Sequence, residues 1–240
     1  MGFITSKGPM PKRVGDCVIY PYEGKYLIRK KSGFTSQALK KHPKYAKSRE
    51  NASNFGRLSR EAKILRDPLK PYLPKRNAMQ VFNGWNKKLH QLSLLDNAEP
   101  GKRSVFHVVH LPEVASQVFG YAFAPTSIVL HGEFKKNAFR LFTSGWKRKD
   151  RQGHFGFRII ALQLNLESRE TEVLEGDWKL YAKATLPKKI NLTLPDEPKQ
   201  GMCWCFLQSD LFQEQEGSFY PLGGEVQNLF LLQVTTPAHR

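Results

Sequence analysis

The chain is poor in acidic side chains, in cysteine and in long apolar runs. Asp and Glu number 21 against 38 Lys and Arg, which gives a formal net charge of +17 at pH 7. Three cysteines, Cys17, Cys203 and Cys205, do not form a disulfide framework, so we expect a reducing, cytoplasmic compartment. No stretch approaches the roughly 18 apolar residues of a membrane-spanning helix, and residues 1–13 lack the apolar core of a secretory signal. We therefore expect no membrane association.

The sequence also lacks the common local signatures of catalytic sites. It contains no G-x-S-x-G elbow, no Walker phosphate loop and no paired C-x-x-C motif. Residues 105–111 are expected to form a strand, which would point His107 and His110 to opposite faces and so weakens the case for a metal site. Cys203 and Cys205 share one face of another expected strand, where we expect small buried apolar side chains. We expect no cofactor and no metal.

What the sequence does have is a strong charge asymmetry. The 40% hydrophobic and 12% aromatic content is typical of a folded protein. Residues 1–103 hold 23 of the 38 basic residues but 7 of the 21 acidic ones, so they carry +16 and the rest of the chain carries +1. This asymmetry favours a basic module for nucleic acid or another polyanion, attached to a neutral module. The alternative is a basic end that meets only counter-ions.

Residues 17–31 give the clearest local signal. The β-prone runs CVIYPY and KYLIRKK are separated by Glu23-Gly24, which predicts a β-hairpin. Pro21 has no backbone N–H, so its strand is expected at a sheet edge. Tyrosines lie close to Arg29, Lys30 and Lys31, a combination that can stack on bases and pair with phosphates. The alternative is that the tyrosines are simply good strand residues.

A basic helix is predicted over residues 43–66, beginning at a proline and ending before Pro68. Helical spacing places an apolar side opposite a basic side. The apolar side consists of Asn51, Ala52, Phe55, Leu58, Ala62 and Leu65, and the basic side of Arg49, Ser53, Arg57, Arg60 and Lys63. Gly56 lies within the basic side, where the missing side chain lets a polyanion or another backbone come close. The alternative is a solvated helix face.

A second helix is predicted over residues 77–95, with Val81, Trp85, Leu89 and Leu92 as its buried stripe. From residue 105 onward the pattern changes to apolar or alternating runs of strand length, separated by turn residues, which favours an antiparallel sandwich or barrel. The predicted fold class is α+β. We expect a flexible basic arm over residues 1–15, a hairpin-helical module over 16–103 and a β-sandwich module over 104–240.

The first 70 residues contain GDCVIY at residues 15–20, GKYLIR at residues 24–29 and Arg49-Glu50-Asn51 followed by Phe55-Gly56. In these stretches the chain resembles uncharacterised, domain-of-unknown-function protein families of Bacteroidota. The resemblance implies a hairpin and a basic helical stretch followed by a β-rich C-terminal part. It brings no activity, cofactor or site residue with it.

Three functions are compatible with these features. The first is a non-enzymatic nucleic-acid-binding protein whose phosphate contacts come from Arg29, Lys30, Lys31, Arg49, Arg57, Arg60 and Lys63. The second is a self-assembling structural subunit of a phage-like particle or filament, since a basic arm and an edge hairpin suit strand exchange between neighbours. The third is an enzyme with a site in the β-rich part, because fold alone does not exclude activity. We favour the first.

Overall fold

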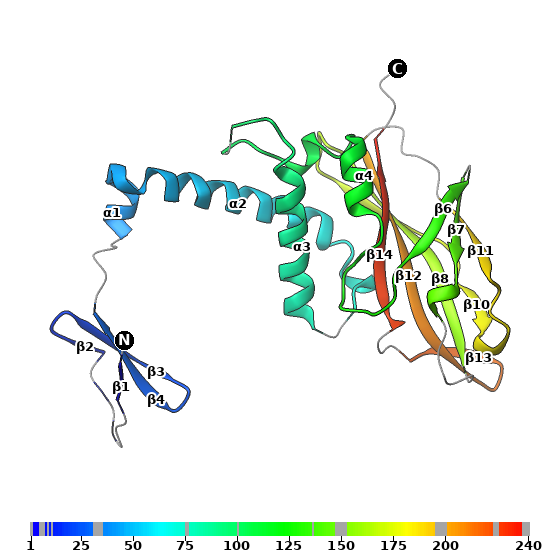
Figure 1. Ribbon diagram of the computed structural model, residues 1–240, viewed down its shortest axis with the longest axis horizontal. Helices are drawn as coiled ribbons and strands as arrows, with labels where there is room; N and C mark the ends of the chain where they lie inside the picture. Colours follow the sequence, from blue (N-terminus) through cyan, green and yellow to red (C-terminus); the bar gives the residue numbers. More distant parts are fainter. Residues whose placement is uncertain are drawn as a thin grey trace. The chain divides into compact units, whose positions relative to one another are not determined.

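The computed structural model describes residues 2–4, 8, 10, 12–30, 36–74, 77–99, 101–135, 137–146, 153–194, 201–222 and 226–236. Its fold class is α+β, with an N-terminal hairpin, then helices, then a large antiparallel sheet (Figure 1). The chain divides into two compact units, Met1–Ala52 and Ser53–Arg240. This division lies well before the module boundary expected between residues 103 and 104.

The first unit contains a four-stranded antiparallel sheet with strand order β1-β4-β3-β2. Its strands are β1 (Gly2–Ile4), β2 (Arg13–Val14), β3 (Cys17–Tyr22) and β4 (Lys25–Lys30). The β3–β4 hairpin is confirmed, and its turn residues Glu23 and Gly24 have φ angles of 47° and 73°. Two consecutive positive φ values are typical of a type I′ turn, whose twist matches that of the flanking strands. β1 and β2 fall within the expected arm of residues 1–15 and pair with β4 and β3. The expected edge position of the Pro21 strand is therefore wrong, because β3 lies between β4 and β2. The short β2 pairs only with Cys17 and Val18, so it requires no backbone N–H from Pro21.

The helical stretch begins with α1 (Ser36–Lys41) and a short 3-10 helix (Pro43–Tyr45), which leads into α2 (Ala46–Arg66). The predicted end of the helix at residue 66 is therefore confirmed. The buried stripe of α2 consists of Leu58, Glu61, Ala62 and Leu65, all in its C-terminal half. The expected apolar side is wrong for the N-terminal half, because Phe55 is 68% exposed. Apolar spacing predicts burial only where another layer covers the helix.

The second unit, from Ser53 onward, is built in three layers (Figure 1). A seven-stranded sheet has the strand path β10-β8-β12-β14-β5, with β9 beside β8 and β13 beside β12. These strands are β5 (Tyr121–Ala122), β8 (His154–Leu164), β9 (Thr171–Glu175), β10 (Lys179–Ala182), β12 (Met202–Gln215), β13 (Ser218–Pro221) and β14 (Asn228–Thr235). A three-stranded sheet has the order β11-β7-β6, made of β6 (His131–Lys135), β7 (Ala138–Phe142) and β11 (Lys189–Thr193).

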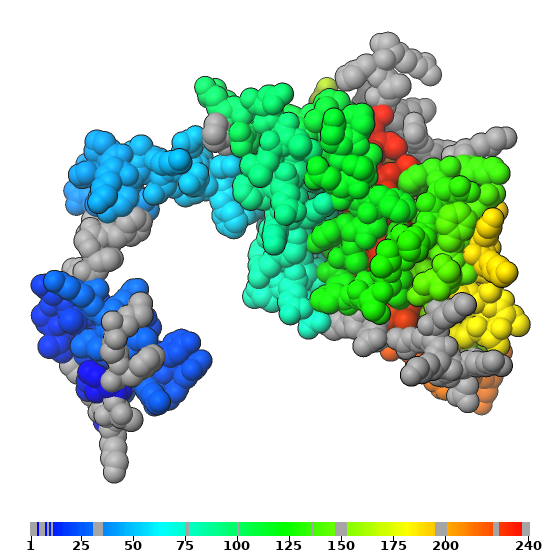
Figure 2. All heavy atoms as spheres, in the orientation of Figure 1, coloured from blue at the N-terminus to red at the C-terminus, as the bar shows by residue number. Residues whose placement is uncertain are grey.

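Helices cover one face of the large sheet. α3 (Ala78–Ser93) buries the predicted stripe Val81, Trp85, Leu89 and Leu92, and Trp85 meets Trp204 of β12 with their ring centroids 6.0 Å apart. The C-terminal half of α2 joins the same hydrophobic cluster. Figure 2 shows atoms of α3 and of α4 (Pro112–Val118) side by side as an outer layer of this unit. The expected split between a helical module and a β module is thus bridged by a shared core.

The opposite face of the large sheet packs against the small sheet. Along β12, Trp204 and Phe206 belong to the helix-side cluster, whereas Cys203, Cys205 and Leu207 belong to the cluster shared with β7 and β11. In the sequence, a strand that is buried on both faces appears as a continuous run of apolar residues, whereas a strand with one exposed face alternates apolar and polar residues. The prediction that the two thiols share one buried face is confirmed, with Sγ atoms 3.6 Å apart.

One expected element is wrong. Residues 105–111 were expected to form a strand, but Val105–His107 is a 3-10 helix followed by a turn. Ser104 caps this helix, and its hydroxyl accepts a hydrogen bond from the backbone N–H of Phe106 at 3.2 Å. A serine side chain that accepts from the backbone two residues onward favours a turn over a strand.

Candidate functional site

The hairpin of the first unit carries an aromatic and basic face. Opposite residues of an antiparallel pair point to the same side of a sheet. The β2–β3 and β3–β4 registers therefore place five side chains together, which we call the tyrosine–arginine face: Arg13, Tyr20, Tyr22, Lys25 and Arg29. The guanidinium of Arg29 lies 5.5 Å from the centroid of the Tyr20 ring. This side of the hairpin thus carries two tyrosines and three cations, together with Val18 and Leu27.

The other predicted residues of the hairpin are placed differently. Lys30 pairs with Cys17 and Tyr26 with Pro21, so Lys30 and Tyr26 lie on the opposite face. Lys31 lies outside the described residues. The three tyrosines and the two described cations of this group therefore lie on two faces. Tyr20, Tyr22 and Arg29 share one face, and Tyr26 and Lys30 share the other.

Two predicted arginines of α2 already bond within the protein. Nη1 of Arg49 donates to the backbone carbonyls of Leu39 at 2.8 Å and of His42 at 3.0 Å, which ties α2 to the end of α1. Nη2 of Arg57 donates to Oδ1 of Asn54 at 2.9 Å. A substitution of Arg49 therefore affects the helix junction as well as any ligand, and contacts from Arg49 and Arg57 to a polyanion stay a prediction.

The other two predicted residues of α2, Arg60 and Lys63, line a surface groove of about 450 Å³ in the second unit. Its lining, which we call the basic groove, is Arg60, Lys63, Ile64, Asp67, Pro68, Arg169 and Thr171. Arg60, Lys63 and Asp67 follow one another at helical spacing, and Arg169 faces them from the loop between β8 and β9. Arg60, Lys63 and Arg169 are exposed, and none forms an ion pair with another described residue.

Arg169 was not predicted, and a turn places it at the groove. Its φ of 60° is left-handed, and its N–H donates to the carbonyl of Asn165 at 2.9 Å. The side-chain oxygen of Asn165 accepts from the N–H groups of Glu167 at 2.9 Å and Ser168 at 3.2 Å. Asn165 is a residue type that favours turns, but the sequence did not show that this turn lies beside α2.

The single carboxylate in the lining of the groove, Asp67, already forms ion pairs with two neighbouring cations. Oδ1 of Asp67 lies 3.3 Å from Nη2 of Arg66 and 3.1 Å from Nζ of Lys70. Burial acts to raise the pKa of Asp67, but the hydrogen bonds and charges of Lys70 and Arg66 outweigh it and lower that pKa. Asp67 is therefore ionised at neutral pH, and its charge is compensated by Arg66 and Lys70, which are not part of the groove lining. The three cations in the lining thus leave the groove with an excess of positive charge.

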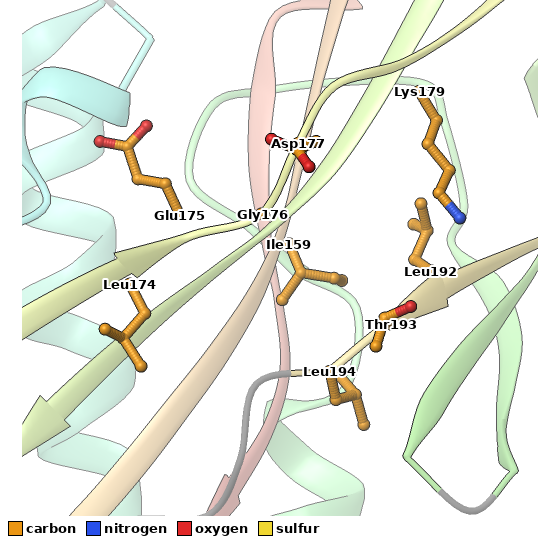
Figure 3. Close-up of a pocket in the computed structure, with 9 residues that line it drawn as sticks. All are labelled: Ile159, Leu174, Glu175, Gly176, Asp177, Lys179, Leu192, Thr193 and Leu194. Atoms are coloured by element: carbon orange, nitrogen blue, oxygen red, sulfur yellow. The ribbon is translucent and has the colours of Figure 1, made fainter.

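A second hollow, of about 280 Å³, lies between the β9–β10 segment of the large sheet and β11 of the small one (Figure 3). Its apolar lining comes from Ile159, Leu174, Leu192 and Leu194, and its polar lining from Glu175, Asp177, Lys179 and Thr193. Nζ of Lys179 donates to the backbone carbonyl of Asn191 at 2.9 Å. This lysine therefore covers a backbone carbonyl of β11, one of the two edge strands of the small sheet.

Glu175 is engaged outside this hollow. Its carboxylate accepts from the hydroxyl of Tyr72 and from Nη1 of Arg158, both at 2.5 Å. The Tyr72 hydrogen bond is the main cause that lowers the pKa of Glu175, while burial and the same bond raise the pKa of Tyr72. Arg158 also lies 4.7 Å from the centroid of the Trp178 ring and donates to Gln208 at 2.7 Å. Every partner is internal, so this cluster links the Tyr72 turn to the sheet.

A buried polar network, which the sequence did not predict, fixes the 3-10 helix at Val105. Glu61 of α2 accepts from the hydroxyl of Ser104 at 2.7 Å and from the N–H of Val105 at 3.0 Å. Oδ2 of Asp96 accepts from the N–H of Ser104 at 2.9 Å and lies 2.8 Å from Nδ1 of His107. The two buried carboxylates accept hydrogen bonds from backbone N–H groups that the start of a helix leaves unpaired. Ser104, His107 and Asp96 therefore hold this loop in position.

Among the residues that the structure describes, no group of three or more His, Cys, Asp or Glu could hold a metal ion. No helix in the same residues is long and apolar enough to cross a membrane. Comparisons with protein-family models, with curated proteins and with solved structures returned no match. The Bacteroidota resemblance therefore stays a prediction.

Proposed function

We propose that this protein binds nucleic acid without catalysing a reaction, through Lys and Arg contacts to phosphates. The observation that supports this proposal best is the basic groove, in which Arg60, Lys63 and Arg169 from two separate elements flank one hollow. A groove with cations along its walls tracks a phosphate backbone better than scattered surface charges do. Because the only carboxylate in the lining, Asp67, has its own partners, it competes weakly with a phosphate for the three cations.

Local acidity sets a limit on affinity at this groove. Glu167 and Glu170 lie on the same turn as Arg169, and Oε2 of Glu170 accepts from the hydroxyl of Ser168 at 3.0 Å. These carboxylates repel a polyanion on the Arg169 side, so we expect Arg60 and Lys63 to contribute more to binding than Arg169. Contacts of this type carry no sequence information, and we expect binding to be independent of sequence.

Salt dependence tests the proposal. For duplex DNA, the slope of log affinity against log salt concentration is about −0.9 for each neutralised phosphate. The triple variant Arg60→Ala, Lys63→Ala, Arg169→Ala should therefore make the slope less negative by between about two and three units and weaken binding at every salt concentration. The control is Lys87→Ala, which removes one exposed cation of α3 outside the groove.

Labelled single-stranded and double-stranded oligonucleotides in a salt series provide the readout, with light scattering on the same samples to exclude aggregation. Binding that is absent at about 50 mM salt contradicts the proposal, since electrostatic contacts are strongest at low salt. Equal slopes for the triple variant and for Lys87→Ala would move the interface away from the groove.

We propose self-assembly as a second candidate, on the basis of the edge strand β6. This strand pairs only with β7 among the described strands, and the exposed fractions of the nearby Val129 and Phe134 are 64% and 41%. An exposed sheet edge with apolar side chains favours pairing with another chain. Phe134→Lys should abolish any concentration-dependent increase in mass by size-exclusion chromatography with light scattering. A monomer at high concentration in the wild type contradicts this candidate.

A further inference from the structure

The tyrosine–arginine face differs from the basic groove in carrying aromatic rings among its cations. The face holds Tyr20 and Tyr22 with Arg13, Lys25 and Arg29, whereas the opposite face of the same strands holds one tyrosine and one cation, Tyr26 and Lys30. Two of the three tyrosines and three of the four cations of β2, β3 and β4 therefore lie on one side of the sheet.

The Tyr22 ring on this face is accessible to a ligand, and the Tyr20 ring is partly exposed. Tyr22 is 48% exposed, and Lys25, opposite Tyr22 in the register, is exposed as well. The guanidinium of Arg29 already lies over the Tyr20 ring at 5.5 Å, so a planar cation and a planar ring are held together by neighbouring strands. The tight turn at Glu23 and Gly24 fixes the ends of both strands and so limits the movement of Tyr22 and Lys25.

We propose that the tyrosine–arginine face binds unpaired bases, so that the protein takes single-stranded nucleic acid in preference to duplex. This inference rests on the proposed nucleic-acid-binding function and assigns its substrate class. Bases in a duplex are stacked on one another and their faces are covered, whereas a single strand exposes base faces that stack on tyrosine while its phosphates meet Arg13, Lys25 and Arg29. The basic groove has no aromatic side chain in its lining, so it discriminates less between the two forms.

The test compares the full-length protein and two tyrosine variants on three ligands at one salt concentration. The ligands are an oligo-dT of about 16 nucleotides, a duplex of the same length, and heparin, a polyanion without bases. Tyr22→Ala should weaken oligo-dT binding by between about 5-fold and 150-fold, because stacking on one aromatic side chain contributes about 1–3 kcal/mol per base. Its affinity for heparin and for the duplex should be unchanged, and Tyr22→Phe, which keeps the ring, should retain most of the oligo-dT affinity.

Tyr26→Ala is the matched control, since it removes a tyrosine of the same hairpin from the opposite face. An equal loss of oligo-dT affinity in Tyr22→Ala and Tyr26→Ala, or no loss in either, overturns the inference. If the variants alter the hairpin itself, photo-crosslinking of wild-type protein to an oligonucleotide containing 4-thiothymidine decides instead. The crosslinked peptides should contain residues 18–29, and crosslinks confined to other segments overturn the inference.

Failure of the inference is distinguishable from failure of the proposed function. Salt-dependent duplex binding that is lost in the basic-groove triple variant, together with an unaffected Tyr22→Ala variant, keeps the function and removes the preference for single strands. Absence of binding to both oligonucleotides at low salt removes both.

Discussion

The N-terminal sheet and the seven-stranded sheet differ in how much of their surface is covered. Within residues 12–30 only Ile19 and Leu27 are buried, and charged or aromatic side chains occupy most other positions. β8 and β12 of the large sheet are instead buried on both faces, by helices on one side and by the small sheet on the other. The difference indicates that packing on both faces stabilises the large sheet, whereas the N-terminal sheet buries few apolar side chains and depends more on its strand pairing and its tight turn.

The largest expected effect comes from removing a ring in the helix-side core of the large sheet. Trp204→Ala should lower the free energy of unfolding of residues 53–240 by about 3–5 kcal/mol, the usual cost of truncating a buried aromatic side chain. Trp204→Phe should cost much less, because it keeps a ring and removes an indole N–H that has no acceptor among the described residues. Urea unfolding followed by tryptophan fluorescence measures both, since all four tryptophans lie in this unit. Similar losses in the two variants would contradict a packing origin of stability.

The next effect concerns the polar network at the edge of the same core. Burial acts to raise the pKa of Asp96, but hydrogen bonds from the N–H groups of Ala98 and Ser104 and the contact with His107 lower it. A lowered folded-state pKa stabilises the protein above the ordinary Asp value of about 3.9, and this contribution is lost as the pH falls through the folded-state pKa.

Asp96→Asn should therefore destabilise residues 53–240 at pH 7 by about 1–3 kcal/mol, the typical cost of leaving buried donors unsatisfied. The difference from wild type should shrink below about pH 4, where the wild-type carboxyl also becomes neutral. Urea unfolding at a series of pH values measures this difference. A deficit that stays constant down to about pH 2 would assign the effect to packing and not to charge.

A smaller effect should be confined to the hairpin. Gly24 has a φ of 73° and an added Cβ would meet nothing within 4 Å, so only backbone conformation opposes a side chain there. Gly24→Ala should destabilise the hairpin by about 1–2 kcal/mol, the usual cost of a left-handed conformation for an L-residue. Amide hydrogen exchange should accelerate in β3 and β4, while the unfolding of residues 53–240 followed by tryptophan fluorescence stays unchanged. Gly24→Asn is the control, because Asn tolerates this conformation.

The contrast between the two sheets also explains what the sequence predicted. A hairpin turn and a helix end depend on residues that are neighbours in the sequence. Glu23-Gly24 therefore predicted the hairpin turn correctly, and Pro68 predicted the end of α2 correctly. The α+β class and the stripe of α3 followed from periodicity. The sequence did not predict which side chains from distant segments come together, because this depends on which layers of the fold pack against each other. Examples are Arg169 beside α2, the hydrogen bond between Glu61 and Ser104, and the exposure of Phe55.

The smallest expected effect separates stability from binding on α2. Gly56 has helical backbone and an added Cβ would meet nothing within 4 Å, so Gly56→Ala should stabilise the helix by about 0.5–1 kcal/mol. If a polyanion approaches the backbone there, the variant should bind oligonucleotide more weakly although its helix is more stable. The reverse substitution Ala52→Gly, at an exposed position of the same helix, should lower stability by a similar amount without changing affinity. Affinity unchanged in Gly56→Ala would confine the interface to side chains such as Arg60 and Lys63, whereas a loss of affinity would extend it along the helix to Gly56.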